Sequence, residues 1–301
     1  MILVIDIGNT TIAFTGMAAK EDGQENPEFE ILFEQKLPTE TGRDLPRFLL
    51  EAEQLLTDQI GKTGLSDSID ADVRKEGFPI SIVAISSVVP ACTPAVEKLA
   101  EKICDTPPVL ISSECDTGLS LARIGAPETI GADRLADSAW AAARFPLPAV
   151  TVDLGTATTI NVIGYLAQDQ EGGGENGKKI PAFLGGMIGA GVRTSLLALH
   201  QLTAQLPALE PEPVFPEEMI GTDTRTNMLS AAVIGTAAMI EGMADRVQEQ
   251  LGTPVTLILT GGNARVVSPW IRHPFYYEPA LAAKGTAVIA LRETRRRRKQ
   301  K

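Results

Sequence analysis

The sequence predicts an α/β protein built from two similar domains, each with a mixed sheet flanked by helices. Strand-like and helix-like segments alternate along the chain, and one strand–turn–strand pattern occurs twice. The first copy runs from Val4 to Phe14 and the second from Val152 to Val162. In each copy an apolar strand is followed by Asp-x-Gly, by small polar residues and by a second apolar strand. This pattern is typical of a β-hairpin with a tight glycine turn.

The remaining elements follow from periodicity and from turn residues. We expect further strands at 80–86, 108–111 and 255–259, helices at 45–59, 94–103, 192–206 and 227–251, and polar loops at 21–27, 66–77 and 168–179. The second hairpin starts about half a chain after the first, so we place an N-terminal domain at 1–146 and a C-terminal domain at 147–294. The basic residues 295–301 are expected to form a solvated, disordered tail.

Composition narrows the class of protein. The 301 residues are 44% apolar and 22% charged, which is ordinary for a globular protein. The net charge of −11 argues against broad binding to nucleic acid or to an anionic membrane. We expect no secretory signal, no membrane span and a cytoplasmic protein. The three widely spaced cysteines are expected to be free thiols. Only two histidines are present, which leaves little room for a histidine-rich zinc site.

The first candidate site is the hairpin turn Asp6-Ile7-Gly8-Asn9-Thr10-Thr11. A glycine in the turn lets backbone N–H groups approach a phosphate, and the short polar side chains add donors. Asp6, at the end of the strand, can hold Mg²⁺ through water. Taken alone, an Asx-stabilised turn explains the same residues.

The second hairpin repeats this chemistry at Asp153-Leu154-Gly155-Thr156-Ala157-Thr158-Thr159. Two such hairpins facing each other would form a phosphate clamp. A third motif, Gly131-Ala132-Asp133-Arg134, opens a predicted helix, where a carboxylate and a guanidinium suit anion binding and proton transfer. A fourth, Thr260-Gly261-Gly262-Asn263, follows a buried strand, and its glycines permit close approach to a nucleoside. Ordinary turns and helix ends are the alternative interpretation of these last two motifs.

Together these residues resemble the type III pantothenate kinases, a family of the actin-like ATPase superfold with two duplicated ribonuclease-H-like domains. The resemblance extends along nearly the whole chain. It rests on Asp6–Thr10, Ser86–Pro90, Gly131–Arg134, Asp153–Thr159, Leu184–Gly186, Thr203–Pro207, Ile220–Thr224 and Thr260–Gly262. The spacing of Gly-Ala-Asp-Arg before Asp-x-Gly-Thr-Ala-Thr-Thr is the most specific part of it.

The resemblance implies ATP-dependent phosphorylation of pantothenate, the first step toward coenzyme A, by a homodimer. It implies that Asp133 is the catalytic base and that Asp153 binds a monovalent cation, K⁺ or NH₄⁺. The ATP-binding residues implied are Asp6, Ile7, Gly8, Asn9, Thr10, Thr11, Ile12, Ala13 and Thr156, with Mg²⁺ accompanying the nucleotide. The pantothenate-binding residues implied are the position of Ile124, then Gly131, Ala132, Asp133, Arg134 and Thr224.

Two departures from the family pattern leave alternatives open. The family usually has Tyr where this chain has Ile124, and commonly Lys where it has Thr222. Both changes would reshape the substrate pocket, so a kinase for another small hydroxyl compound is one alternative. Ile124 and the basic tail also suit a non-catalytic regulatory member of the family.

Overall fold

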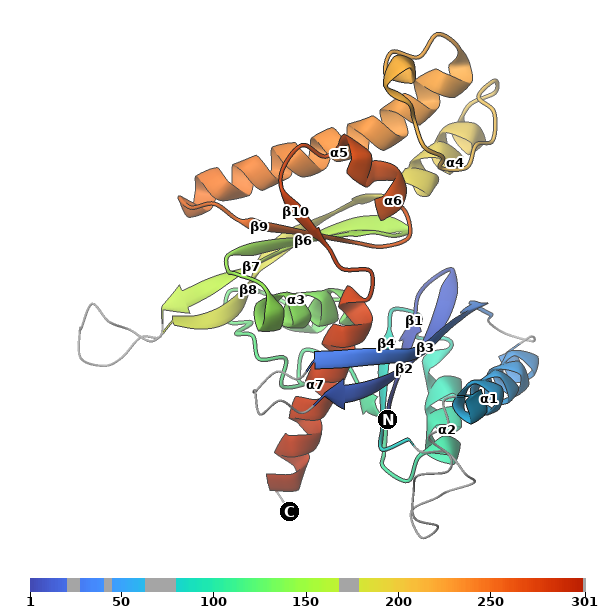
Figure 1. The fold of residues 1–301 in the computed structure, drawn as a ribbon, viewed down its shortest axis with the longest axis vertical. Helices are drawn as coiled ribbons and strands as arrows, with labels where there is room; N and C mark the ends of the chain where they lie inside the picture. The colour runs from blue at the N-terminus through green and yellow to red at the C-terminus, as the bar shows by residue number, and fades with distance from the viewer. Residues whose placement is uncertain (21–27, 41–44, 63–79, 168–178, 300–301) are drawn as a thin grey trace. The chain divides into compact units, whose positions relative to one another are not determined.

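The computed structural model describes residues 1–20, 28–40, 45–62, 80–167 and 179–299 (Figure 1). It contains two five-stranded sheets and divides into two compact units. Unit 1 comprises residues 1–118, 126–143 and 281–301, and unit 2 comprises 119–125 and 144–280. The expected loops at 21–27 and 66–77, and all but the last residue of 168–179, lie outside the described residues.

The sheet of unit 1 has the strand order β3-β2-β1-β4-β5. β1 is antiparallel to β2 and parallel to β4, and β4 is parallel to β5. Alternate apolar residues of β1 and β2 pack with the helices α1 and α2 on one face. The bounds are β1 Ile2–Ile7, β2 Thr11–Lys20, β3 Glu28–Pro38, β4 Ile82–Ser87, β5 Val109–Leu110, α1 Leu45–Lys62 and α2 Thr93–Ile103.

The sheet of unit 2 has the order β10-β9-β6-β7-β8, which is the same arrangement read from the other edge. β6 is antiparallel to β7 and parallel to β9, as β1 is to β2 and β4. In both sheets the register shifts between the second and third hairpin strands, after Gly16 in one and after Val162 in the other. The bounds are β6 Ala149–Leu154, β7 Ala157–Ala167, β8 Lys179–Ala190, β9 Thr256–Thr260 and β10 Phe275–Tyr277. The predicted α/β class and both predicted hairpins are therefore confirmed.

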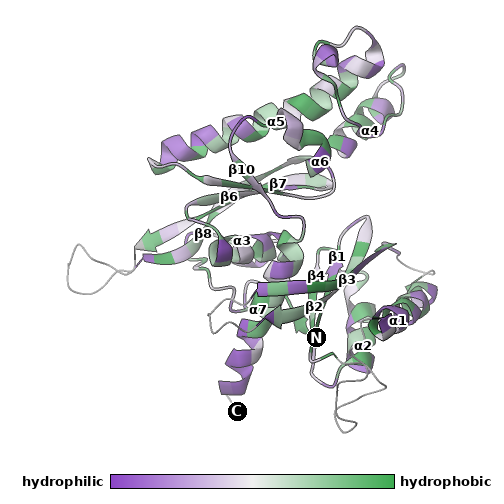
Figure 2. Cartoon of the chain, viewed as in Figure 1, coloured by the Kyte–Doolittle hydropathy of each residue, from purple (hydrophilic) through white to green (hydrophobic). Residues whose placement is uncertain are grey.

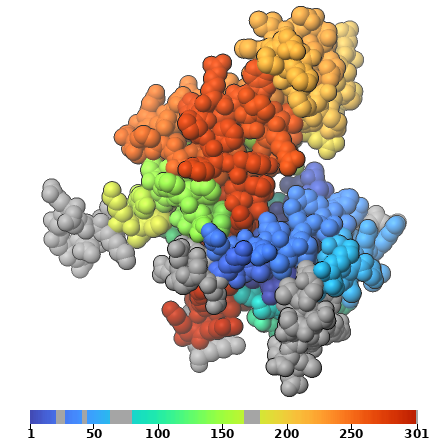
Figure 3. All heavy atoms as spheres, in the orientation of Figure 1, coloured from blue at the N-terminus to red at the C-terminus, as the bar shows by residue number. Residues whose placement is uncertain are grey.

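Unit 2 also contains the longest helix, α5 (Thr224–Leu251), with α4 (Val192–Leu202) and the short α6 (Ala264–Val267). Asp223 caps α5, since its Oδ1 accepts the Thr226 N–H at 2.8 Å, and Gly252 ends it with φ of 66°. α5 is long and apolar enough to cross a membrane by length and composition. Its buried residues pack into the core of unit 2. A helix of a protein core can satisfy the same criteria of length and composition. In Figure 3 the side chains of α4 and of the start of α5 form the yellow and orange part of the surface.

Unit 1 takes in two helices from later in the chain, α3 (Ala132–Arg144) and α7 (Leu281–Lys299). α7 packs on β1 and β4, on the face of the sheet opposite α1 and α2. The two helices touch at backbone distance, because a Cβ on Gly285 would collide with the Ala136 carbonyl. Residues 295–299, which we expected in a disordered tail, form the last turns of α7, hydrophilic in Figure 2; 300–301 lie outside the described residues.

A charged cluster fastens the segment before β10 to α5 in unit 2. The His273 ring lies between two carboxylates of α5, with Nδ1 3.1 Å from Glu241 Oε1 and Nε2 2.8 Å from Asp245 Oδ1. Glu241 Oε1 also accepts the backbone N–H groups of Arg272 and His273. The hydrogen bonds to both carboxylates raise the pKa of His273 above its usual range.

Candidate active site

The first predicted phosphate loop is the turn between β1 and β2, and it is held by a residue that the sequence analysis missed. The Gly8 N–H donates to the Thr11 carbonyl at 3.0 Å. Thr39, just after β3, donates its hydroxyl to the Gly8 carbonyl at 2.6 Å and its N–H to the Thr10 carbonyl at 3.0 Å. Asn9, Thr10 and Thr11 remain exposed. The loop is thus fixed at its base and open at its tip, as a phosphate cradle requires.

Asp6 is only partly exposed, at the end of β1, beside a second carboxylate. Burial raises its pKa to about 6; the Ser86 hydroxyl opposes this shift, the charge of Asp133 adds to it, and the charge of Lys36 opposes it. Asp6 and Asp133 are therefore near enough to interact although they are far apart in the sequence. A pair of like charges at one place suits a positively charged ligand or metal ion.

Asp133 lies in the first turn of α3, which confirms that Gly-Ala-Asp-Arg opens a helix. Its Oδ1 accepts the Arg134 N–H at 2.8 Å. A Cβ on Gly131 would collide with that same oxygen, so glycine at this position leaves room for the carboxylate. Arg134 is half-buried, and desolvation lowers the pKa of its guanidinium while Asp133 and Asp137 raise it. An anion-binding group and a proton acceptor thus start the same helix.

The second loop, between β6 and β7, is also closed by a hydrogen bond from the N–H of its glycine. The Gly155 N–H donates to the Ala157 carbonyl at 3.1 Å. The Thr156 carbonyl accepts the Gly191 N–H at 3.1 Å and the Thr194 hydroxyl at 2.6 Å. The side chain of Thr156 itself is exposed. The start of α4 therefore supports this loop as Thr39 supports the first.

The predicted glycine motif after β9 packs against the second loop. Gly261 has φ of 92°, and a Cβ there would collide with Asp153 Oδ1 and the Leu154 backbone. Asn263 donates its side-chain N–H to the Leu154 carbonyl at 3.2 Å and to the Gly155 carbonyl at 3.4 Å. Glycine is needed here for both its backbone angle and its lack of a side chain. The motif therefore fixes the surroundings of Asp153.

The two remaining predicted substrate residues lie in unit 2. Ile124 is half-buried in the segment 119–125, where its N–H donates to the Leu121 carbonyl at 2.9 Å. Thr224 is exposed at the first position of α5. Neither lies in the same unit as Asp6, Asp133 and Arg134. Their roles stay predictions.

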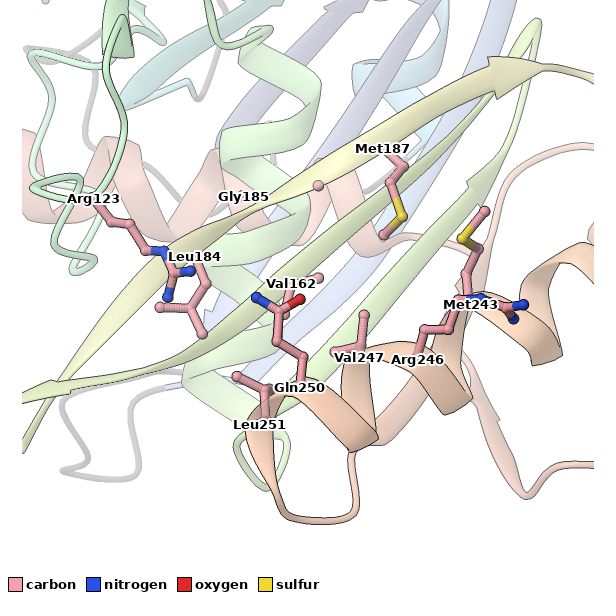
Figure 4. A pocket seen from close by; sticks show the side chains of 11 residues that line it. Arg123, Val162, Leu184, Gly185, Met187, Met243, Arg246, Val247, Gln250 and Leu251 are labelled. Atoms are coloured by element: carbon pink, nitrogen blue, oxygen red, sulfur yellow. The ribbon is translucent and has the colours of Figure 1, made fainter.

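Unit 2 also contains a cavity of about 330 Å³ between β8 and the C-terminal half of α5. Figure 4 shows the Met187 and Met243 side chains turned toward one another there, with Arg123 beside Leu184. The cavity is lined by Arg123, Val162, Leu184, Gly185, Gly186, Met187, Met243, Arg246, Val247, Gln250 and Leu251. The predicted catalytic and nucleotide-binding residues are not among these.

Comparison with known proteins decides the family. The model of the type III pantothenate kinase family matches residues 2–246. The chain belongs to the type III pantothenate kinase family. A type III pantothenate kinase from Caulobacter vibrioides is 31% identical over 98% of each chain. One from Zymomonas mobilis is 32% identical over 96% of this chain and 92% of its own. The match spans both hairpin loops and the Gly131–Arg134 motif.

Family membership agrees with the architecture, since two mixed sheets of one strand order, flanked by helices, form the predicted actin-like ATPase fold. Two solved structures are similar to this chain at low sequence identity. The activator of 2-hydroxyisocaproyl-CoA dehydratase from Clostridium difficile has a TM-score of 0.44 at 13% identity, covering 99% of this chain and 97% of its own. Component A of the Acidaminococcus fermentans (R)-2-hydroxyglutaryl-CoA dehydratase has 0.46 at 14%, covering 98% and 97%.

Proposed function

We propose that this protein transfers the γ-phosphoryl group of ATP to the terminal hydroxyl of pantothenate, the first step of coenzyme A biosynthesis. The observation that carries the proposal is the family match across residues 2–246, with Asp6, Asp133 and Arg134 all present in one unit. A phosphate loop, a proton acceptor and an anion-binding guanidinium are the parts that such a reaction needs.

In this mechanism Asp133 accepts the proton of the substrate hydroxyl. The hydroxyl oxygen then forms a bond to the γ-phosphorus as the bond from that phosphorus to the bridging oxygen of ADP breaks. Arg134 holds the anionic substrate, and Gly131 leaves space for the Asp133 carboxylate beside it. Backbone N–H groups of the Gly8–Thr11 loop stabilise phosphate charge. ATP binding would extend over Asp6–Ala13 and Thr156, and pantothenate binding over Ala132, Ile124 and Thr224.

Mg²⁺ fits beside Asp6. Burial and the charge of Asp133 both disfavour the negative charge of Asp6, and a cation would compensate that charge. Asp6 would hold it through water, and the ion would neutralise phosphate charge. A monovalent cation, K⁺ or NH₄⁺, fits at Asp153, because Gly261 has no side chain that would collide with the Asp153 carboxylate oxygen Oδ1. Within the described residues no group of three His, Cys, Asp or Glu side chains is placed to hold a metal. Both cations would therefore depend on water, backbone or nucleotide oxygens.

We also propose that the protein is a cytoplasmic homodimer whose subunit consists of an N-terminal domain, 1–146, with the ATP phosphate loop, and a C-terminal domain, 147–294. Exposed apolar side chains around the start of α5 support an interface with a second copy. They include Leu202, which is 84% exposed, and Ile220, which is 82% exposed.

The decisive test is a coupled ATP assay with pantothenate, Mg²⁺ and K⁺, comparing the wild type with Asp133→Asn. We expect turnover that depends on both cations and falls by roughly 10²–10⁴-fold in the variant, because the amide cannot accept the proton. Full turnover in Asp133→Asn would refute the assigned base. A wild type that phosphorylates another hydroxyl compound in preference to pantothenate, or none, would refute the assigned substrate.

A further inference from the structure

One row of side chains crosses the sheet of unit 1 beside the first loop. In the strand registers Asp6 pairs with Ser86 of β4 on one side and with Ala13 of β2 on the other, and Ala13 pairs with Lys36 of β3. Directly paired residues point to the same face of a sheet. Ser86, Asp6, Ala13 and Lys36 therefore form a single row, with Lys36 two strands from Asp6.

The core on the other face confirms the direction of this row. Phe33 and Leu37 of β3 pack in the cluster that contains α1 and α2, together with Ile12 and Phe14 of β2. Because side chains alternate along a strand, Lys36 points to the opposite face, which is the face of Asp6. Lys36 is also three residues before Thr39, which fastens the first loop.

The spacing allows Lys36 to act near Asp6. Neighbouring strands lie about 4.8 Å apart, so two strands separate the backbones by about 10 Å. The four-carbon stem of lysine can extend over the methyl group of Ala13, the only side chain between them in the row. The lysine charge already acts on the site, since it lowers the pKa of Asp6 while Asp133 raises it.

The present partner of Lys36 is weak. Its Nζ lies 3.0 Å from Glu34 Oε1, and the two side chains are 60% and 49% exposed. Exposed ion pairs of this kind contribute little and exchange readily. The lysine is thus able to turn toward a stronger anion that arrives beside Asp6 and the Gly8–Thr11 loop.

We propose that Lys36 binds the terminal phosphate of ATP and offsets its charge next to Asp6 and Asp133. The proposal rests on the proposed kinase function and assigns one more residue to its nucleotide site. A site with two carboxylates repels a polyphosphate, and an ammonium group at the end of the same row counters that repulsion.

The test compares Lys36→Met with two controls. Lys20→Met removes another exposed lysine of the same sheet, paired with Glu30 at 3.3 Å. Glu34→Gln removes the partner of Lys36. Calorimetry measures how tightly each protein binds a non-hydrolysable ATP analogue and how tightly it binds ADP, both in the presence of Mg²⁺. The coupled assay gives kcat and KM for ATP.

We expect Lys36→Met to lower the affinity for the ATP analogue by roughly tenfold or more, and the affinity for ADP by less than about threefold. The reason is that only the ATP analogue carries the terminal phosphate. Lys36→Arg should recover most of the loss, and both controls should match the wild type. Equal weakening of both nucleotides, an unchanged Lys36→Met, or the same loss in Glu34→Gln would overturn the proposal.

The nucleotide measurements separate this inference from the function on which it rests. If the wild type binds the ATP analogue but does not phosphorylate pantothenate, the proposed substrate is refuted, while the ratio of ATP-analogue to ADP binding still decides the role of Lys36. If the wild type binds neither nucleotide, both proposals are overturned.

Discussion

Replacing Asp6 by Asn should stabilise the protein while it abolishes turnover. Burial holds the pKa of Asp6 at about 6 in the folded chain, against 3.8 for an unperturbed carboxyl. The folded state therefore keeps a proton that the unfolded chain releases between these values, and stability falls as pH rises through this window. Asparagine has a similar shape and no charge, so it removes this cost.

The magnitude follows from the two pKa values. At about 1.4 kcal/mol per pKa unit, the difference between 3.8 and about 6 destabilises the folded state by about 3 kcal/mol at pH 8. The same linkage leaves roughly half of that cost at pH 5. Asp6→Asn should therefore raise the free energy of unfolding by about 3 kcal/mol at pH 8, and by roughly half as much at pH 5.

The assay is denaturant unfolding of the nucleotide-free protein at both pH values. Asp58→Asn, on the exposed side of α1, is the matched control and should change stability by less than about 0.5 kcal/mol. Mg²⁺ with ATP should stabilise the wild type more than Asp6→Asn, because the variant lacks the carboxylate proposed to hold the ion. No gain at pH 8, or an equal gain at pH 5 and pH 8, would show that Asp6 carries no buried charge.

Three further changes test other parts of the fold. Gly131→Ala should lower kcat by at least roughly tenfold with ATP binding retained, since its Cβ would displace the proposed catalytic carboxylate; kcat within twofold of wild type would contradict this. Gly285→Ala should lower the free energy of unfolding by about 2 kcal/mol or more through collision with α3, whereas Gly235→Ala, facing open space on α5, should raise it by up to about 1 kcal/mol. His273→Gln should destabilise by up to about 1 kcal/mol below pH 6.5, because the raised pKa gives stability that is lost as pH rises through it; a pH-independent effect in thermal unfolding would argue against the ion pairs.

Local features of this chain could be predicted well from its sequence. Each hairpin depends on neighbouring residues, an apolar strand followed by Asp-x-Gly, and both formed where the pattern placed them. The helix opened by Gly131–Arg134 and the alternation of strands and helices were equally local signals. The duplicated pattern also predicted two sheets of one kind, which the matching strand orders confirm.

Contacts between distant segments could not be predicted in this way. Thr39 supports the first loop only because β3 pairs with β2 in one register, and the segment between them has no pattern that sets it. The last helix packs on β1 and β4, although it follows the strands of the other unit in sequence. Nothing in the local composition of α7 specifies which sheet it covers.

By itself, the sequence determined which chemical groups are available. These are a turn suited to phosphate binding at Asp6, a second copy of this turn at Asp153, and a carboxylate beside a guanidinium at Asp133 and Arg134. The tertiary structure decided which of these groups act on one another. It placed Asp133 near enough to Asp6 to raise its pKa, and set Lys36 in the same row to lower it. The reason is physical, since a turn is specified by a few adjacent residues, whereas electrostatic coupling depends on strand register and helix packing across the whole unit.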